Sequence, residues 1–304
     1  MIAHRIKSLT RRGLSLVGSK FGGAPHGRKV ILCFHSIRPN APHSSIHPDH
    51  FDRMLGWLTQ FTDVMEVNAL LKSDRTGNPR PAVAITFDDG HKDNATLAMP
   101  IALRHGVTFT VFITVGVVER NPRAVNRFKS VLRQDSADFD VLTWDDAASL
   151  VEQGFSIGSH TWDHPMLSHL SDDGIDFQLR ISKEFIEKRL GLRDIGMCYP
   201  YGKFGRNVDR RVARLTEAAG YTYGLAVEHR RIREHENRFL IPRFIVNSHT
   251  IEQLKRQVEG EEDFHGWISR SMPAALARRL SPTDFSEAAD AEPPLCARSP
   301  DIEG

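Results

Sequence analysis

The sequence predicts an α/β fold in which parallel β-strands close into a barrel, and two patterns support this. Seven apolar, β-branched runs alternate along the chain with stretches in which apolar residues recur at helical spacing, the pattern of repeated βα units. Several runs are apolar on both faces, as expected of strands buried between a filled barrel centre and an outer layer of helices. The 304 residues suffice for one α/β barrel, which commonly needs about 250.

The predicted strands are the runs richest in Val, Ile, Phe and Thr. They span residues 30–37, 82–87, 107–115, 155–159, 195–199, 221–227 and 239–246. The predicted helices lie between them, several with an Asp or Asn cap at the start and Gly after the end. They span residues 48–61, 94–105, 144–152, 172–190, 207–219 and 251–259. Residues 119–140 interrupt the alternation with several arginines and little β pattern, which predicts a long loop or a short helix over the strand ends.

Composition divides the chain into a barrel at residues 30–265 and two extensions. Residues 1–29 carry lysines and arginines but no acid, with Ile and Leu at loose helical spacing. We expect this basic arm to be solvated, with a helix on an anionic membrane surface as the alternative. Residues 266–304 form a C-terminal extension that we expect to be largely a disordered tail, because its end is rich in Pro, Ser, Ala and acids.

Charge and cysteine usage limit the class of protein. The formal net charge of +2 gives no sign of a nucleic-acid partner. No apolar stretch reaches the roughly 20 residues of a membrane span and no signal-peptide pattern is present. We therefore expect a cytoplasmic protein, in which the basic arm offers peripheral contact with the inner membrane surface. The cysteines, Cys33, Cys198 and Cys296, are too scattered for a disulfide framework and fit a reducing compartment, and Cys33 lies in an apolar run that indicates core packing.

Three polar motifs each follow an apolar strand run, and this placement predicts one shared site. They are Asp88-Asp89-Gly90 after AVAITF, residues 160–165 after FSIGS, and Tyr199-Pro200-Tyr201-Gly202 after IGMC. Residues just beyond the carboxyl ends of parallel strands converge at one end of a barrel, although they are far apart in sequence. Two carboxylates and two imidazoles meeting there predict a metal hydrolase.

The acidic pair and the histidine pair are the residues that would carry this chemistry. Two carboxylates at the end of a buried strand repel one another unless a cation or a proton resolves the conflict. A strand-end turn with Asp capping a helix is the structural alternative. The spacing of His160 and His164 puts both imidazoles within reach of one cation. Two imidazoles and one carboxylate leave a coordination position open for water, so that one aspartate would bind metal and the other would accept the proton of the water.

The segments TFDDG, HTWDHP and YPYG, in this order and spacing, resemble the first three motifs of the polysaccharide deacetylases, carbohydrate esterase family four, also called the NodB-homology domain. The resemblance spans about residues 30–259. It implies a distorted (β/α)7 TIM-like barrel that removes N-acetyl, sometimes O-acetyl, groups from sugars with one divalent metal. We expect zinc, with cobalt, nickel or manganese as alternatives.

The resemblance also implies roles for single residues. Asp88 would be the general base, and the metal ligands would be Asp89, His160 and His164. Tyr201 would offer its backbone N–H to the oxyanion, where one donor is worth about a hundredfold or more in rate, and Pro200 belongs to the same substrate-binding motif. Trp162 and Trp144 could present flat faces to a pyranose, although core packing explains Trp144 equally well.

The chain departs from the family pattern at two positions. Cys198 stands where an arginine commonly orients the base, and we expect Arg243, inside the last predicted strand, to replace it. An edge-strand arginine facing solvent is the alternative. The family's late Leu-x-x-His-type motif is not cleanly present. His249, just past the last predicted strand, is the first candidate for the catalytic acid, and His35, past the strand run VILCF, is the second.

The main hypothesis is a metal-dependent hydrolase that removes N-acetyl groups from a polysaccharide or a glycan precursor. The second is a hydrolase of another linear or cyclic amide, because a metal centre does not specify the acyl group. The third is a glycan-binding barrel whose catalysis is weakened by the loss of the usual arginine.

Overall fold

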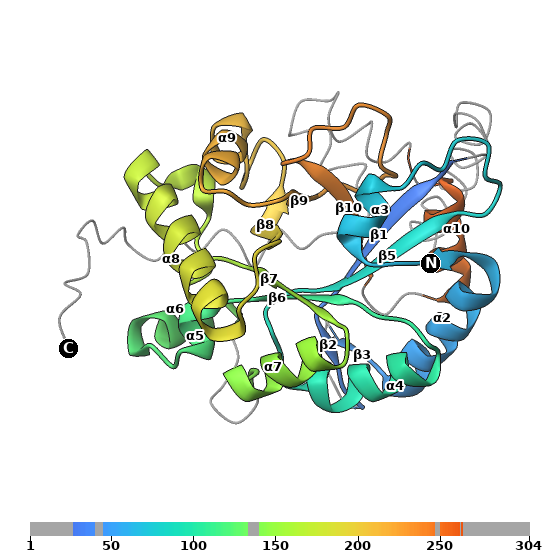
Figure 1. Ribbon diagram of the computed structural model, residues 1–304, viewed down its shortest axis with the longest axis horizontal. Coiled ribbons are helices and arrows are strands. Elements are labelled where there is room, and N and C mark those ends of the chain that lie inside the picture. The colour runs from blue at the N-terminus through green and yellow to red at the C-terminus, as the bar shows by residue number, and fades with distance from the viewer. Residues whose placement is uncertain (1–26, 40–44, 133–139, 247–249, 262, 264–304) are drawn as a thin grey trace, which may run out of the picture.

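Seven parallel strands form a closed barrel in the computed structural model, which describes residues 27–39, 45–132, 140–246, 250–261 and 263. The strands are β1 (Lys29–Phe34), β5 (Ala82–Phe87), β6 (Thr110–Ile113), β7 (Ser156–Ser159), β8 (Met197–Lys203), β9 (Gly224–Val227) and β10 (Ile241–Ile245). Their order is β1-β10-β9-β8-β7-β6-β5, and β5 pairs back with β1, which closes the ring. The (β/α)7 barrel predicted from the sequence is therefore confirmed (Figure 1).

The barrel is distorted beside β5. The amino-terminal half of this strand pairs with β4 (Asp63–Val64), whereas the carboxyl-terminal half pairs with β6. The short helix α3 (Val67–Lys72) follows β4, and its Val67 and Leu70 pack with the residues inside the barrel. Neither element was predicted, and neither was the small sheet of β2 (Ser36–Ile37) and β3 (Ser45–Ile46), because two-residue strands and a six-residue helix are too short to show a pattern.

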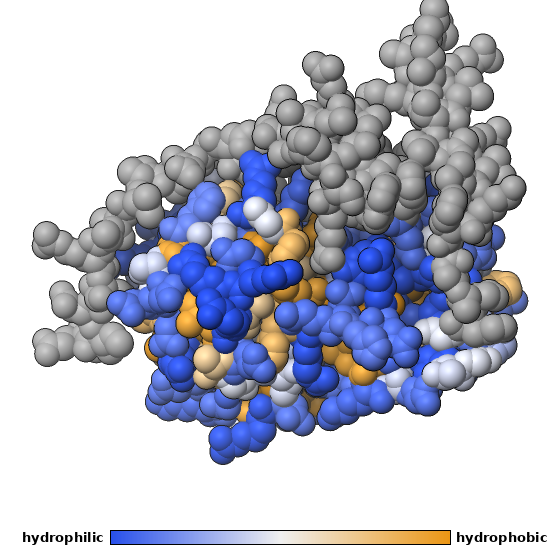
Figure 2. Space-filling model, turned by 90° about the horizontal axis from the view of Figure 1, so that it is seen from above, coloured by the Kyte–Doolittle hydropathy of each residue, from blue (hydrophilic) through white to orange (hydrophobic). Residues whose placement is uncertain are grey.

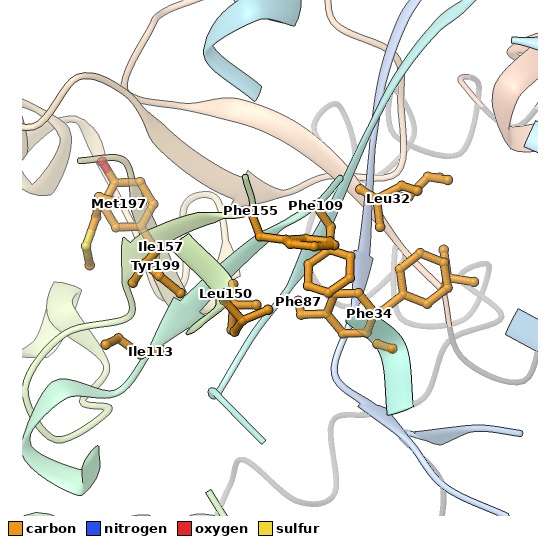
Figure 3. Close-up of a cluster of buried hydrophobic side chains, with 14 of the residues drawn as sticks. Leu32, Phe34, Phe87, Phe109, Ile113, Leu150, Phe155, Ile157, Met197 and Tyr199 are labelled. Atoms are coloured by element: carbon orange, nitrogen blue, oxygen red, sulfur yellow. The ribbon is translucent and has the colours of Figure 1, made fainter. Parts of the chain in front are cut away.

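Side chains that alternate along the strands separate two apolar cores. The inner core fills the barrel and includes Ile31, Ala84, Phe112, Tyr223, Leu225 and Ile241. The outer core lies between the strands and the helices. Figure 3 shows a row of phenylalanines in it, Phe34, Phe87, Phe109 and Phe155, whose successive ring centroids lie 5.5, 4.8 and 4.4 Å apart. The row ties β1, β5, β6 and β7 together on the side opposite to the barrel interior.

The outer layer consists of helices, most of which were predicted with correct bounds (Figure 1). The predicted bounds are confirmed for α2 (Pro48–Phe61), α7 (Trp144–Glu152), α8 (Asp172–Leu190) and α10 (Ile251–Glu259), and α9 (Arg210–Ala218) is shorter than expected. Their ends are marked by caps, such as the capping box of Thr143 and Asp146 at the start of α7. Residues 119–140 contain the helix α6 (Pro122–Leu132), which follows α5 (Val115–Val118). The short-helix alternative is therefore correct for this part.

The predicted helix at residues 94–105 instead begins with a π-helical turn, η1 (Asn94–Ala98), and continues as α4 (Met99–Arg104). Pro100 accounts for this change, because proline has no N–H for the residue four positions earlier and its ring clashes with that carbonyl. A wider turn before the proline avoids both conflicts, and such turns are frequent at functional sites.

Three predictions fall on residues that the structure does not describe: the basic arm up to residue 26, His249, and the C-terminal extension at residues 266–304. Within the described part, no helix is long and apolar enough to cross a membrane. On the face shown in Figure 2, hydrophilic residues predominate and apolar residues show between them.

Gly196, immediately before β8, lets an aromatic ring pack directly against the strand backbone. A Cβ added there would lie 2.1 Å from Cζ of Tyr223, which is fully buried in the barrel. We expect Gly196→Ala to lower the free energy of unfolding by about 1–3 kcal/mol, the usual cost of overpacking, as measured by chemical denaturation. Gly56→Ala in α2 is the matched control, because its Cβ would meet only a side-chain atom 3.6 Å away; it should stabilise the helix by up to about 1 kcal/mol. Equal effects of the two substitutions would contradict the tight contact.

Candidate active site

The three predicted motifs lie together at the carboxyl-terminal end of the barrel. Asp88 and Asp89 follow β5, His160 follows β7, and Tyr201 belongs to the last part of β8. The rings of His160 and His164 lie 4.9 Å apart, and the rings of His164 and Tyr201 are also 4.9 Å apart. The convergence that was expected from the strand ends is therefore present.

The backbone is strained at these motifs. Four of their non-glycine residues have left-handed φ angles: Asp89 (75°), Thr161 (69°), His164 (62°) and Tyr201 (59°). Such conformations cost of order 1–3 kcal/mol each and cluster at active sites. Elsewhere in the described chain only Arg120 and His235 share this property. The strain thus marks the site independently of the side-chain chemistry.

Asp89, His160 and His164 fit a divalent metal ion. Their ligand atoms all lie within 4.8 Å of one another, and the Nε2 atoms of both histidines lie 3.5 Å from Oδ1 of Asp89. A tetrahedral ion with ligands at about 2.0–2.1 Å separates them by about 3.4 Å. His160 Nδ1 donates to the carbonyl oxygen of Cys198 at 2.8 Å, which leaves Nε2 as the binding atom. Oδ1 of Asp89 is buried and has no hydrogen-bond partner among the described residues.

The protonation states in this group also suit a metal. Burial, with a further contribution from His160, lowers the pKa of His164 to about 3. The imidazole is therefore neutral near pH 7, the form that binds metal. Burial alone would raise the pKa of Asp89, but the contact with His91 and the nearby His164 outweigh it and hold this pKa far below its ordinary value. Asp89 thus remains a carboxylate.

Asp88 has a separate set of partners. Arg243 donates from Nη1 to Oδ1 and from Nη2 to Oδ2 of Asp88, both at 2.8 Å. The Sγ atoms of Cys33 and Cys198 lie 3.3 and 3.2 Å from the same Oδ2. Arg243 is 0% exposed, so the alternative of a solvent-facing arginine is wrong. Arg243 therefore contacts Asp88 in place of the arginine that is commonly found at the position of Cys198.

These contacts make the two oxygens of Asp88 unequal. Oδ2 receives Arg243 and two thiols, whereas the described donor to Oδ1 is Arg243 alone. Burial raises the pKa of the Cys33 thiol well above its ordinary value, so it stays protonated and can donate. Cys33 is buried in the core, as predicted, and its sulfur in addition lies beside the carboxylate of Asp88. Oδ1 is the oxygen with capacity left for a proton.

Removing Arg243 is expected to move the acid limb of the pH–rate profile upward. Burial alone raises the pKa of Asp88, and Arg243 followed by His160 outweighs it, so the pKa lies well below its ordinary value. Without the arginine the pKa rises, by roughly 1–3 units, and a higher pH is needed to keep the base ionised. We would measure kcat/KM against pH for Arg243→Met, with metal content and unfolding in parallel. Arg243→Lys keeps the charge and should shift the acid limb less. If the acid limb does not move in Arg243→Met, Arg243 has only a structural role.

His35 also lies beside the base. One of its ring nitrogens lies within 4.8 Å of a carboxylate oxygen of Asp88 and of Cys33 Sγ. The loop that carries it is fixed, because Asn94 Nδ2 donates to the His35 carbonyl at 2.9 Å. Asp93, which is buried, accepts hydrogen bonds from Ser36, Ile37 and Arg38. Burial lowers the pKa of His35, which favours its neutral form.

The residues predicted to contact the substrate differ in their burial and packing. Pro200 is buried in β8, while Tyr201 is partly exposed. The ring of Trp162 packs against Phe185 of α8 at 5.2 Å and against the backbone of Gly116, where a Cβ would lie 2.7 Å from the indole. Trp162 is therefore held within the protein, and its contact with a saccharide stays a prediction.

His91 belongs to the same site, although the sequence reasoning did not single it out. Its Nε2 lies 3.7 Å from Oδ2 of Asp89, and its side chain is buried. Its position directly after TFDDG was the available signal.

Comparison with known proteins gives one family. The model of the polysaccharide deacetylase family matches residues 75–224, which include Asp88, Asp89, both candidate ligand histidines and Tyr201. YxkH of Bacillus subtilis is 25% identical over 202 residues, which cover 65% of this chain and 64% of YxkH. The poly-β-1,6-N-acetyl-D-glucosamine N-deacetylase of Staphylococcus aureus is 22% identical over 241 residues, 76% of this chain and 77% of that protein. The chain spans 23% of the peptidoglycan-N-acetylglucosamine deacetylase PgdA of Listeria monocytogenes, with 28% identity over 131 residues.

A solved structure shows the same fold. The Streptococcus pyogenes deacetylase PplD, determined in complex with acetate, superposes with a TM-score of 0.62 at 21% sequence identity. The superposition covers 76% of this chain and 98% of PplD. The barrel is thus shared by a protein of a different and distant sequence.

Proposed function

Because the chain belongs to the polysaccharide deacetylase family, we propose that it is a metal-dependent hydrolase that removes N-acetyl groups from a saccharide. The observation that carries this proposal is that two adjacent aspartates have different partners. Asp88 is held by Arg243, whereas Asp89 faces His160 and His164. A base and a metal-ligand set therefore stand side by side, as hydrolysis by an activated water requires.

Each residue has a distinct task in this reaction. A metal ion bound by Asp89, His160 and His164 would supply Lewis acidity to the amide carbonyl and acidify a water. Oδ1 of Asp88 accepts the proton of the attacking water, and Arg243 holds the carboxylate ionised and oriented. The backbone N–H of Tyr201 donates to the oxygen on which negative charge develops.

The proton for the leaving nitrogen needs a donor, and two histidines are candidates. His35 lies beside Asp88, and its ring is neutral because burial lowers its pKa. It can therefore deliver a proton only after it has received one from the base. His249, which the structure does not describe, is the other candidate.

We propose zinc as the ion, because two imidazoles, one carboxylate and an open position are typical of catalytic zinc. Cobalt, nickel and manganese suit the same donors. The names of two relatives point to substrates that contain N-acetylglucosamine, as a β-1,6 polymer and in peptidoglycan. An N-acetylated saccharide is the corresponding proposal for this chain. The contact of Arg243 with Asp88 removes the reason for the hypothesis of a weakened glycan-binding barrel.

An acetate-release assay tests the proposal. Zinc-loaded protein would be offered N-acetylglucosamine oligomers with β-1,4 and β-1,6 linkages, alongside simple linear amides and cyclic imides. We expect acetate from at least one saccharide, loss of this release with a chelator, and recovery when metal is returned. Hydrolysis of a cyclic imide without acetate release from any saccharide would instead support the hypothesis of another amide substrate.

We also propose that the protein works in the cytoplasm, with its basic arm in contact with the inner membrane surface. The unpaired thiols of Cys33 and Cys198 support a reducing compartment. Cell fractionation tests this location, and recovery of the protein outside the cytoplasmic and inner-membrane fractions would contradict it.

A further inference from the structure

Helix α6 lies beside the candidate metal centre and carries a basic side chain, Arg127. The ring of Phe128, its neighbour, meets His164 edge to face with centroids 5.5 Å apart. The guanidinium of Arg127 lies 4.0 Å from Oδ2 of Asp163, the residue that precedes His164. Burial raises the pKa of the Tyr201 phenol, and the positive charge of Arg127 offsets part of this rise. Arg127 therefore pairs with the residue next to a candidate metal ligand, and its charge acts on the expected oxyanion residue.

Among the described residues, none accepts a hydrogen bond from the guanidinium of Arg127. A guanidinium offers five N–H donors, yet 4.0 Å to Asp163 is too long for a hydrogen bond. Oδ1 of Asp163 is engaged by Gln178 Nε2 at 2.7 Å. The Nε of Arg127 is buried and has no acceptor in the described part of the chain. The side chain is nevertheless 39% exposed, so a ligand can reach its outer end.

Two other arginines of the described chain contrast with this one. Arg243 makes a two-point contact with Asp88 at 2.8 Å, and Arg230 makes one with Glu236 at 2.6 and 2.9 Å. Both of those arginines are paired within the protein. Arg127 has the 4.0 Å ion pair with Asp163, but no described carboxylate makes a two-point contact with its guanidinium.

We infer that the saccharide substrate is anionic and that Arg127 binds its negative group, a carboxylate or a phosphate, next to the acetamide that is hydrolysed. This inference rests on the proposed function. The planar guanidinium matches both oxyanions through two parallel hydrogen bonds. Asp88 and Asp89 do not compete for it, because the first is paired with Arg243 and the second faces His160 and His164. A neutral saccharide would offer the guanidinium only uncharged oxygens, in addition to the 4.0 Å ion pair with Asp163.

Three oligosaccharides with one N-acetylhexosamine backbone test the inference: one neutral, one carrying a neighbouring carboxylate and one carrying a neighbouring phosphate. For the wild type we expect a lower KM for at least one anionic substrate. Arg127→Gln should raise that KM about tenfold to a hundredfold, the usual worth of hydrogen bonds to a charged group, with kcat little changed. The neutral substrate should be affected less than about twofold. The anionic substrate whose KM rises more in Arg127→Gln identifies the group as carboxylate or phosphate.

Arg123→Gln is the matched control, because Arg123 lies one turn earlier on α6 and is exposed. It should leave all three KM values unchanged, and thermal unfolding should be similar in both variants. A wild type without preference for either anion would overturn the inference, as would an equal loss on neutral and anionic substrates in Arg127→Gln. Equilibrium binding of the same oligosaccharides to zinc-loaded protein separates this result from failure of the proposed function. If no substrate releases acetate, the proposed function fails. Binding of an anionic oligosaccharide that depends on Arg127 would still support the inference, and no such binding would overturn it.

Discussion

Asp88→Asn is expected to keep its metal and to lose turnover by about 10²–10⁴-fold, the usual contribution of a general base. Asparagine preserves the shape of the side chain, but its amide cannot accept a proton from the attacking water. The metal should remain because its expected ligands, Asp89, His160 and His164, are untouched. The measurement is kcat for acetate release together with elemental analysis of the same preparation.

Stability must be controlled in this experiment. Arg243 is fully buried and donates twice to Asp88, so the amide leaves a buried charge uncompensated, at a cost of about 3–5 kcal/mol. The double variant Asp88→Asn, Arg243→Met removes this charge and should regain stability without regaining turnover. Wild-type activity in Asp88→Asn would exclude Asp88 as the base. Loss of metal instead would exchange the roles of Asp88 and Asp89.

His160→Ala and His164→Ala are each expected to abolish metal retention and, with it, activity. Each substitution removes one of three ligand atoms that lie within 4.8 Å of one another. Removing a residue that only supports a ligand typically lowers metal affinity 10- to 100-fold. Removing a direct ligand should lower it more. Metal per chain would be measured after dialysis against a weak chelator.

His105→Ala is a suitable control for these variants, because His105 contacts Asp52 at 3.1 Å, in a part of the fold that carries none of the three motifs. It should keep its full metal content. Full metal content and full activity in both His160→Ala and His164→Ala would contradict the assigned ligand set.

The barrel could be predicted because its strands are apolar, β-branched runs and most of its helices are long enough to show the helical period. The helices α2, α7, α8 and α10 have the predicted bounds, since capping residues mark their ends. The elements β4 and α3 could not be predicted, because two and six residues carry no period. The π-helical start before Pro100 depends on a local clash that the apolar spacing of residues 94–105 does not reveal.

The ligand group was predictable because it depends only on which residues follow strands. The contact between Arg243 and Asp88 could be anticipated because Cys198 occupies the position of the usual arginine. The thiol contacts of Cys33 and Cys198 with Asp88 could not. Strands that are apolar on both faces do not show which residues point into the barrel, and that direction decides whether Cys33 meets the base or the outer core. The position of Arg127 depends in the same way on how α6 lies over the strand ends.

Titration of metal-free protein with zinc, with acetate release measured after each addition, tests most directly whether one metal ion works with Asp88. We expect no release before zinc is added, a linear rise in rate with zinc, and a plateau at one equivalent per chain. Acetate release at full rate from metal-free protein, or no release at any zinc concentration from any N-acetylated saccharide, would contradict a metal-dependent deacetylase.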